Sequence, residues 1–207
     1  MLKIWGRNTS SNVQKAMWAV GEIGLAHERY DVGGNYGKNR DPFYLAMNPN
    51  GLVPTLQDDD FIMWESNAIV RYLARQYGAG TLEPSDPRAV GRANQWMDWQ
   101  LSVVGPAIFA AFWGLIRTPE DKRDMAAINA SLNKTTDAMK ILNAQLGRTA
   151  YVAGAEFSMG DIPVGVMAYR FRQLNPDRPD LPHLERWYAS LQARKAFKEH
   201  VESIPLS

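Results

Sequence analysis

Two short pieces of sequence decide the fold of this chain: NGLVPTL at residues 50–56 and WESNAI at residues 64–69. Proline has no backbone N–H to donate to a sheet ladder, so Pro54 belongs at the end of a strand or at a bend. X-Pro bonds are also the peptide bonds that adopt the cis form with any frequency. A cis Val53–Pro54 bond turns the backbone N–H and C=O of Val53 outward, where an extended peptide can pair with them as an added strand. A simple turn proline is the alternative.

The second piece places a carboxylate and a hydroxyl at the start of a helix predicted over 65–77. A helix N-terminus offers free N–H groups and the positive end of the dipole. Ser66 is expected to cap this helix and to donate to a carboxylate, and Glu65 is an acceptor for an ammonium group. Together they suit the head of an α-amino acid. The alternative is that both residues serve only as helix caps.

Hydrophobic periodicity extends this pattern to the whole chain. It predicts strands at 2–5, 27–32, 53–56 and 61–64, and helices at 10–24, from 41 onward and at 65–77. Residues 81–87, with two prolines and two acidic residues, are typical of a linker. Beyond it only helices are predicted, at 89–116, 120–146, 161–174 and 182–196. The sequence therefore predicts an α/β unit followed by an all-helical unit, with domains at 1–80 and 88–207.

One helix start in the second unit is strongly marked, in the sequence FSMGDI at residues 157–162. Ser158 is the predicted N-cap and Asp161 its reciprocal partner three residues later. Phe157 and Ile162 are spaced as a hydrophobic staple. This is a folding feature, and its removal is expected to cost ~1–2 kcal/mol of stability.

Composition excludes several classes of function. The 207 residues include 23 Lys and Arg against 22 Asp and Glu, and neither unit has the basic excess of a nucleic-acid binder. There is no cysteine, which excludes disulfides, cysteine metal sites and a cysteine nucleophile. The three histidines form no metal-spaced pair, so a zinc enzyme or a Ser-His-Asp hydrolase is disfavoured and no metal is expected. Any sulfur chemistry must use a thiol from outside.

No signal peptide is visible in residues 1–10. The one membrane-like stretch, 99–116, contains Gln100, Ser102 and the pair Gly105-Pro106. It is predicted to be a kinked, buried core helix rather than a membrane span, in a cytoplasmic protein.

A third polar group, Ser10-Ser11-Asn12, lies where the first strand gives way to the first helix. Hydroxyl and N–H donors at a helix N-terminus stabilise a nearby anion. No histidine is near in sequence to make Ser10 a nucleophile. We therefore expect these residues to act as donors to a bound thiolate.

With these motifs the chain resembles the cytosolic glutathione transferase family. The features that carry the resemblance are the β-α-β-α-β-β-α order, residues 48–54, the Glu65-Ser66 pair and the capping box at 157–161. The resemblance implies a thioredoxin-like glutathione-binding domain at 1–80 and a helical domain at 88–207 that forms the second-substrate pocket. It implies that Val53, before Pro54, pairs with the cysteinyl backbone of glutathione, and that Glu65 and Ser66 hold the γ-glutamyl end. It also implies a cytosolic homodimer with active sites near the subunit interface.

Within the family, the chain is similar to bacterial members of theta-like serine type or of nu-like type. Trp5-Gly6-Arg7 stands where tyrosine-type members have tyrosine. Ser10 aligns best with the residue that contacts the thiol, and Ser11 and Asn12 are the alternatives. Many relatives hold the glycine carboxylate with a basic residue just before Val-Pro, but here that residue is Leu52. Lys38 or Arg40 is the expected substitute, or each is a surface charge.

The resemblance also gives a role to aromatic residues of the first long helix. Phe109, Trp113 and Arg117 are expected to line an apolar pocket for the second substrate, although residues at this spacing also suit core packing. The predicted activity is conjugation of the glutathione thiolate, glutathione being the co-substrate, to electrophilic apolar substrates in detoxification. The alternatives are a glutathione-dependent disulfide or peroxide reductase and a non-enzymatic binding or regulatory protein on the same fold.

Overall fold

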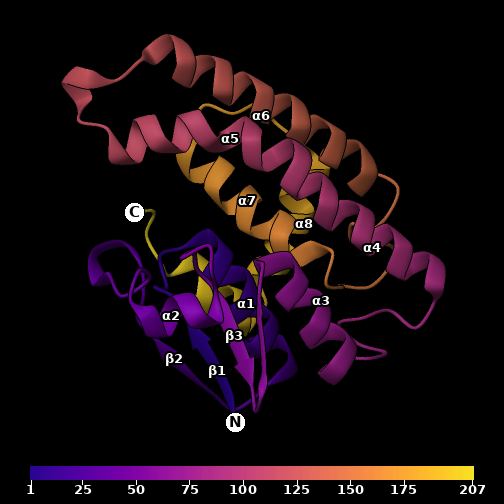
Figure 1. Ribbon diagram of the computed structural model, residues 1–207. Helices are drawn as coiled ribbons and strands as arrows, with labels where there is room; N and C mark the ends of the chain where they lie inside the picture. Colours follow the sequence, from indigo (N-terminus) through magenta and orange to yellow (C-terminus); the bar gives the residue numbers. More distant parts are fainter.

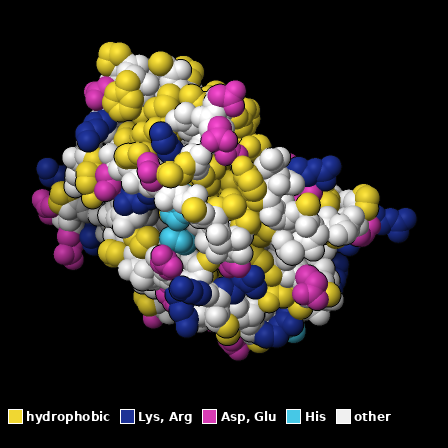
Figure 2. All heavy atoms as spheres, turned by 90° about the horizontal axis from the view of Figure 1, so that it is seen from below, with side chains coloured by type: hydrophobic (Ala, Val, Ile, Leu, Met, Phe, Trp, Pro, Cys, Tyr) yellow, Lys and Arg dark blue, Asp and Glu magenta, His cyan; other side chains and the backbone are white.

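The computed structural model describes residues 1–207 and consists of two parts (Figure 1). An α/β part, drawn in indigo and purple, holds the N-terminus. The helical part lies beside it, and the end of the chain returns to the α/β part, where it packs on the first helix. This confirms the predicted fold class, a thioredoxin-like unit followed by an all-helical unit. On the face seen in Figure 2, basic and acidic side chains are interspersed.

The α/β part is built on a four-stranded sheet with the order β2-β1-β3-β4. Strand β1 is parallel to β2 and antiparallel to β3, and β3 and β4 form the predicted hairpin. Helices α1 and α3 pack against each other. The strands are β1 Leu2–Trp5, β2 His27–Tyr30, β3 Thr55–Asp58 and β4 Phe61–Trp64, and the helices are α1 Ser11–Ile23, α2 Pro42–Met47 and α3 Ser66–Tyr77, with a 3₁₀ turn at Gly34–Tyr36.

The helical part is dominated by a long helical hairpin, in which α5 packs along α6 (Figure 1). Its first arm is continuous from Pro87 to Arg117 and includes two π-helical turns. The helices are α4 Pro87–Trp99, α5 Gly105–Phe112, α6 Met125–Leu146, α7 Asp161–Leu174, α8 Pro182–Gln192 and α9 Lys195–Phe197; the π-helical turns are Gln100–Val104, Trp113–Arg117 and Lys198–Glu202, and Glu120–Lys122 is a 3₁₀ turn.

Several predicted boundaries differ from the observed ones. The strand expected at 53–56 begins at Thr55, because Pro54 cannot donate to the ladder. Ser66 was predicted to be the cap of α3. It is instead the first residue of this helix. The cap is Glu65, whose φ of 75° ends the preceding extended segment. The helix expected at 182–196 stops at Gln192 and is followed by the short α9.

The apolar stretch 99–116 was expected to be a buried core helix rather than a membrane span, and it is buried only in part. The helix is long and apolar enough to cross a membrane by length and composition alone, and only 22% of its apolar window is buried inside the molecule. Among its exposed apolar residues, Leu101, Phe109 and Trp113 line a cavity. The stretch is therefore apolar because it forms a cavity wall.

The reciprocal hydrogen bonds expected at the start of α7 are present, with two differences. The N-cap residue is Gly160 and not the predicted Ser158, because α7 begins at Asp161. The carboxylate of Asp161 accepts hydrogen bonds from the backbone N–H of Ser158 (2.9 Å) and from its hydroxyl (3.3 Å). The Ser158 oxygen in turn accepts from Gly160, one residue earlier than in the standard box. Asp161 also accepts from Val152 N–H and from the indole of Trp187. Burial raises the pKa of Asp161 to about 6, although these hydrogen bonds oppose the rise.

The hydrophobic core is continuous across the two parts of the molecule. Helix α1 carries eight consecutive buried residues, 13–20. It packs against α3 of its own part and against α7 and α9 of the other. Trp18 lies against Phe157 and Phe197 of the helical part. The start of α1 is thereby held in a fixed position opposite the helical part.

Candidate active site

A cavity of about 520 Å³ lies between the two parts of the molecule. Its volume is in the range usual for small-molecule sites. One side is formed by the β1–α1 loop, the start of α1 and residues 52–53, and the other by α5, its flanking π-helical turns and α7. The lining residues are Arg7, Ser10, Ser11, Asn12, Lys15, Leu52, Val53, Gln100, Leu101, Gly105, Pro106, Ile108, Phe109, Phe112, Trp113, Arg117, Met167 and Arg170.

The turn at Val53 presents free backbone groups to this cavity. The Val53–Pro54 bond is cis, one of the two forms expected from the sequence. The Tyr44 hydroxyl (2.6 Å) and the Asn48 amide (2.9 Å) both donate to the carbonyl of Leu52, and Thr55 donates to the Tyr44 hydroxyl. Val53 belongs to no strand, and its N–H and C=O make no hydrogen bond within the chain. They are available to an extended peptide.

Close packing presses the β1–α1 loop against this turn. A Cβ on Gly6 would lie 2.4 Å from Cγ2 of Val13 and 3.2 Å from Cβ of Val53, and the φ of Gly6 is 155°. Only glycine fits here. The loop that leads to Ser10 therefore lies directly beside Val53.

Ser10, Ser11 and Asn12 all line the cavity. Ser10 is the N-cap residue of α1, but its hydroxyl makes no capping hydrogen bond, so it remains free to donate elsewhere. Asn12 differs, because its side-chain oxygen accepts a hydrogen bond from the hydroxyl of Ser66 (3.1 Å). Of the three candidates, Ser10 thus combines an unused hydroxyl with a position at a helix N-terminus.

Glu65 and Ser66 lie at the N-terminus of α3, next to the start of α1 through the Ser66–Asn12 hydrogen bond. Ser66 is buried and Glu65 is exposed. The backbone of Glu65 has φ 75° and ψ 108°, a conformation that residues other than glycine rarely adopt. Such conformations cost about 1–3 kcal/mol and cluster at functional sites. This conformation therefore adds to the case for a ligand at Glu65.

Lys38 and Arg40 lie outside the cavity lining, on the exposed loop before α2. Arg40 contacts the segment that precedes Val53, since its guanidinium donates to the carbonyl of Asn50 (3.4 Å). Lys38 makes no side-chain hydrogen bond or ion pair and has a φ of 65°. Of the two, Arg40 is the one that contacts the segment leading to Val53.

Phe109, Trp113 and Arg117 form the wall of the cavity on the helical side. The rings of Phe109 and Trp113 are stacked with centroids 5.9 Å apart, and they are 60% and 49% exposed. The guanidinium of Arg117 lies 5.4 Å from the Trp113 ring and donates to the carbonyl of Ser207. The wall combines an apolar surface with a positive charge.

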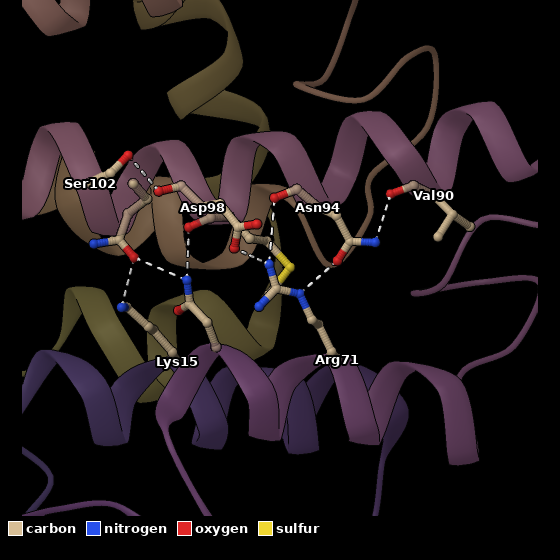
Figure 3. A network of polar contacts seen from close by, with 9 residues as sticks. Lys15, Arg71, Val90, Asn94, Asp98 and Ser102 are labelled. Atoms are coloured by element: carbon tan, nitrogen blue, oxygen red, sulfur yellow. Dashed lines mark hydrogen bonds and ion pairs between the residues drawn. The ribbon is translucent and has the colours of Figure 1, made fainter.

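A polar network at the cavity wall was not predicted from the sequence (Figure 3). Lys15 is 1% exposed, and its ammonium donates to the side chain of Gln100 (2.8 Å). Asn67 donates to the carbonyl of Met97 (2.8 Å). Burial lowers the pKa of Lys15 to about 7, with a further contribution from Arg170. The network joins α1 and α3 to the first π-helical turn and so ties the two walls together.

Arg7 and Arg170 also line the cavity and were missed. Arg170 had a signal in the sequence, because it follows eight uncharged, mostly apolar residues, 162–169. Its guanidinium carbon lies 4.3 Å from the centroid of the Phe112 ring. Arg7 follows the first strand directly, and only the fold shows that it faces the same space.

Comparison with known proteins places this site in a family. The chain matches the family models for the glutathione S-transferase N-terminal domain, over residues 1–75, and C-terminal domain, over residues 125–190. Glutathione S-transferase GstB of Escherichia coli (strain K12) is 42% identical over 209 residues, with all of both chains covered. Glutathione S-transferase 3 of Zea mays is 30% identical over 213 residues, 99% of this chain and 95% of that protein.

Solved structures give the same result. The theta class glutathione S-transferase from the citrus canker pathogen Xanthomonas axonopodis pv. citri, with glutathione bound, is 45% identical to this chain, with a TM-score of 0.95. The alignment covers 100% of this chain and 99% of that one. A glutathione S-transferase from Pseudomonas fluorescens is 28% identical, with a TM-score of 0.83 over 99% of this chain and 98% of that one.

The fold and these relatives together define a transferase that acts on glutathione. The chain belongs to the glutathione S-transferase family. Its activity is the conjugation of glutathione to electrophiles.

Proposed function

We propose that glutathione lies along the Val53 turn with its sulfur at Ser10, and that residues 1–80 bind it while residues 88–207 bind the electrophile. The free N–H and C=O of Val53 support pairing with the cysteinyl backbone. Glu65 accepts from the γ-glutamyl ammonium, and Ser66 donates to its carboxylate. Arg40, with Lys38 as the alternative, holds the glycine carboxylate.

The observation that carries this proposal is the unused hydroxyl of Ser10 at the N-terminus of α1. A free thiol titrates near pH ~8.5, and lowering that pKa to ~6.5 requires about 2.7 kcal/mol of selective stabilisation of the thiolate. One hydrogen bond to a charged group contributes ~1.5–3 kcal/mol, and the helix end adds to it. Ser10 with α1 therefore suffices to generate the nucleophile. The thiolate then attacks the electrophilic carbon, and the leaving group departs with its electron pair.

Ser10→Ala is expected to lower turnover roughly ten- to a hundred-fold at pH values below the thiol pKa, because the thiolate loses a donor worth ~1.5–3 kcal/mol. Glutathione affinity is expected to stay within a few-fold, since the ends of the peptide are held elsewhere. The measurement is the ultraviolet absorbance of the bound thiolate against pH, which is expected to shift to higher pH in the variant.

The matched variants Ser11→Ala and Asn12→Ala serve as controls. A titration that moves in one of these but not in Ser10→Ala assigns the donor to that later residue. If none of the three moves the titration, side-chain donation to sulfur at this position is ruled out.

We also propose a cytoplasmic homodimer that acts in detoxification, with α3 and α4 at the subunit contact. These helices lie side by side and are joined by Arg71 of α3, which donates to Asn94 (2.6 Å) and pairs with Asp98 of α4 (Figure 3). Next to them the edge strand β4 exposes Phe61, Ile62 and Trp64. An exposed apolar edge strand is a surface that a partner normally covers.

The dimer is expected to sediment at micromolar concentration as one species of twice the 23.3 kDa chain mass. Ile62→Lys places a charge in this surface and is expected to shift the population toward monomer. Sedimentation of the wild type as a 23.3 kDa species would contradict the proposed dimer.

A further inference from the structure

The cavity has an unusual charge. Four of its lining side chains are basic, namely Arg7, Lys15, Arg117 and Arg170; the three arginines are cationic at neutral pH, and no lining residue is acidic. None of the four takes part in an ion pair within the chain. Cations collected in a partly enclosed site without counter-charges repel one another and attract an anion. The binding site of a purely apolar substrate does not require them.

Arg170 makes the strongest case among these cations. It is 6% exposed, and its guanidinium makes no hydrogen bond in the molecule; its buried Nε has no partner. The guanidinium of Arg170 instead lies over the face of the Phe112 ring. Buried arginines normally pair with a carboxylate or donate to carbonyl groups. A guanidinium left without a partner at a cavity wall is a binding site for a ligand acceptor.

The neighbouring arginines lie close enough to act with Arg170. Burial first, and then the charges of Arg117 and Arg7, lower the pKa of Arg170 to about 10. Burial and the charge of Arg117 likewise lower the pKa of Arg7. All three guanidinium groups therefore interact through one space. An anion bound among them removes their mutual repulsion.

Glutathione itself does not account for this cluster. In the proposed function its γ-glutamyl end lies at Glu65 and Ser66 and its glycine end beside the loop at 38–40, all on the α/β side. Arg117 and Arg170 come from the helical side, next to the stacked rings of Phe109 and Trp113. The unpaired charge is thus beside the surface available to the second substrate.

We propose that the second substrate is an electrophile with an apolar body and a carboxylate group, and that Arg170, with Arg117 and Arg7, binds this carboxylate. The inference rests on the proposed function and narrows its substrate class. The planar fork of a guanidinium matches the two oxygens of a carboxylate. Phe109 and Trp113 contact the apolar body and leave the electrophilic carbon facing the sulfur. The carboxylate orients the substrate but takes no part in bond making.

The test compares two aryl chlorides, a chloronitrobenzoate and the matching chloronitrobenzamide, which share the ring, the nitro group and the leaving chloride. In each case sulfur bonds to the ring carbon, chloride leaves with the electron pair, and the thiol proton is lost to buffer. Values of kcat/KM are divided by the rate of each probe with free glutathione, which removes the difference in intrinsic reactivity. The wild type is expected to prefer the benzoate about ten-fold or more.

Arg170→Met removes the charge and keeps most of the volume. It is expected to reduce the preference for the benzoate about ten- to a hundred-fold, chiefly by raising the KM of the benzoate, because a bond between charged groups is lost. Arg170→Lys is expected to restore part of the preference. The matched control is Arg172→Met, two residues along α7, whose guanidinium pairs with Glu185 and lies outside the cavity. It is expected to keep the full preference.

Three results overturn the inference: a wild type without preference for the benzoate, an equal loss with both probes in Arg170→Met, and a raised KM for glutathione as the main effect. If Arg170→Met melts well below the wild type, Arg117→Met replaces it, since Arg117 is exposed. Turnover of the benzamide without preference for the benzoate contradicts this inference alone. Absence of turnover with both probes contradicts the proposed function.

Discussion

The double variant Glu65→Ala/Ser66→Ala is expected to bind glutathione at least about a hundred-fold more weakly than the wild type. Each substitution removes one hydrogen bond to a charged group of the γ-glutamyl end, and each such bond is worth ~1.5–3 kcal/mol. Together they amount to ~3–6 kcal/mol, and every 1.4 kcal/mol is about a factor of ten in affinity. Titration calorimetry with glutathione measures the loss directly.

The fold is expected to survive this double change. Glu65 is exposed, and the hydroxyl of Ser66 bonds only to the exposed Asn12, which water can satisfy. Circular dichroism and the melting temperature check this point. The control is Glu156→Gln. Glu156 is exposed and lies in the loop before α7, so this variant is expected to bind glutathione normally. Unchanged affinity in the double variant would place the γ-glutamyl end somewhere else.

Asp161→Ala is expected to lower the free energy of unfolding by about 3–5 kcal/mol, more than the ~1–2 kcal/mol of an ordinary helix cap. The carboxylate accepts from three separate segments: Ser158 at the helix start, Val152 in the preceding turn, and Trp187 of α8. Its removal leaves four buried donors without partners, because Ser158 donates through both its N–H and its hydroxyl, and each costs ~1–3 kcal/mol. Partial relaxation keeps the total below the sum.

Urea denaturation measures this loss. Asp137→Ala is the control, since Asp137 forms an exposed ion pair with Lys140 on α6 and is expected to change stability by less than ~0.5 kcal/mol. A loss below about 1 kcal/mol for Asp161→Ala would mean that water enters the site and replaces the carboxylate. Activity per folded molecule is expected to be unchanged, because Asp161 lies away from the cavity lining.

Local patterns allowed much of this molecule to be predicted from sequence. The order of strands and helices along the first unit and the start of α7 at Asp161 follow from local patterns, and Pro54 made a cis bond one of two expected forms. The backbone conformation of Glu65 did not follow from such patterns, because nothing in the residue type signals a φ of 75°. Glu65 lies at the junction of β4 and α3 and is the cap of α3, a position that was wrongly predicted for Ser66.

The basic residues that line the cavity could not be predicted from the sequence for a different reason. Arg170 is far from Arg7 and Lys15 along the chain, and only tertiary packing brings the three to one cavity. Lys15 lies off the apolar face that periodicity marks at Val13, Ala16 and Val20, so the sequence signals neither its burial nor its partner Gln100. The apolar residues of α5 led to a prediction of more burial than the structure has, because a cavity wall and a protein core are built from the same apolar side chains.

The hydrophobic core that the two parts share limits how such an enzyme can be divided into fragments or recombined with a relative. Helix α1 belongs to the α/β part by sequence, yet Trp18 is enclosed by Phe157 and Phe197, and Glu22 pairs with Arg194 (2.6 Å). A fragment cut in the segment at 81–87 would bare this face to water and aggregate. Exchange of the helical half between relatives faces the same obstacle. New substrate preferences in this lineage therefore arise most easily by single side-chain changes on α5 and α7, where residues face the cavity and leave the joint intact.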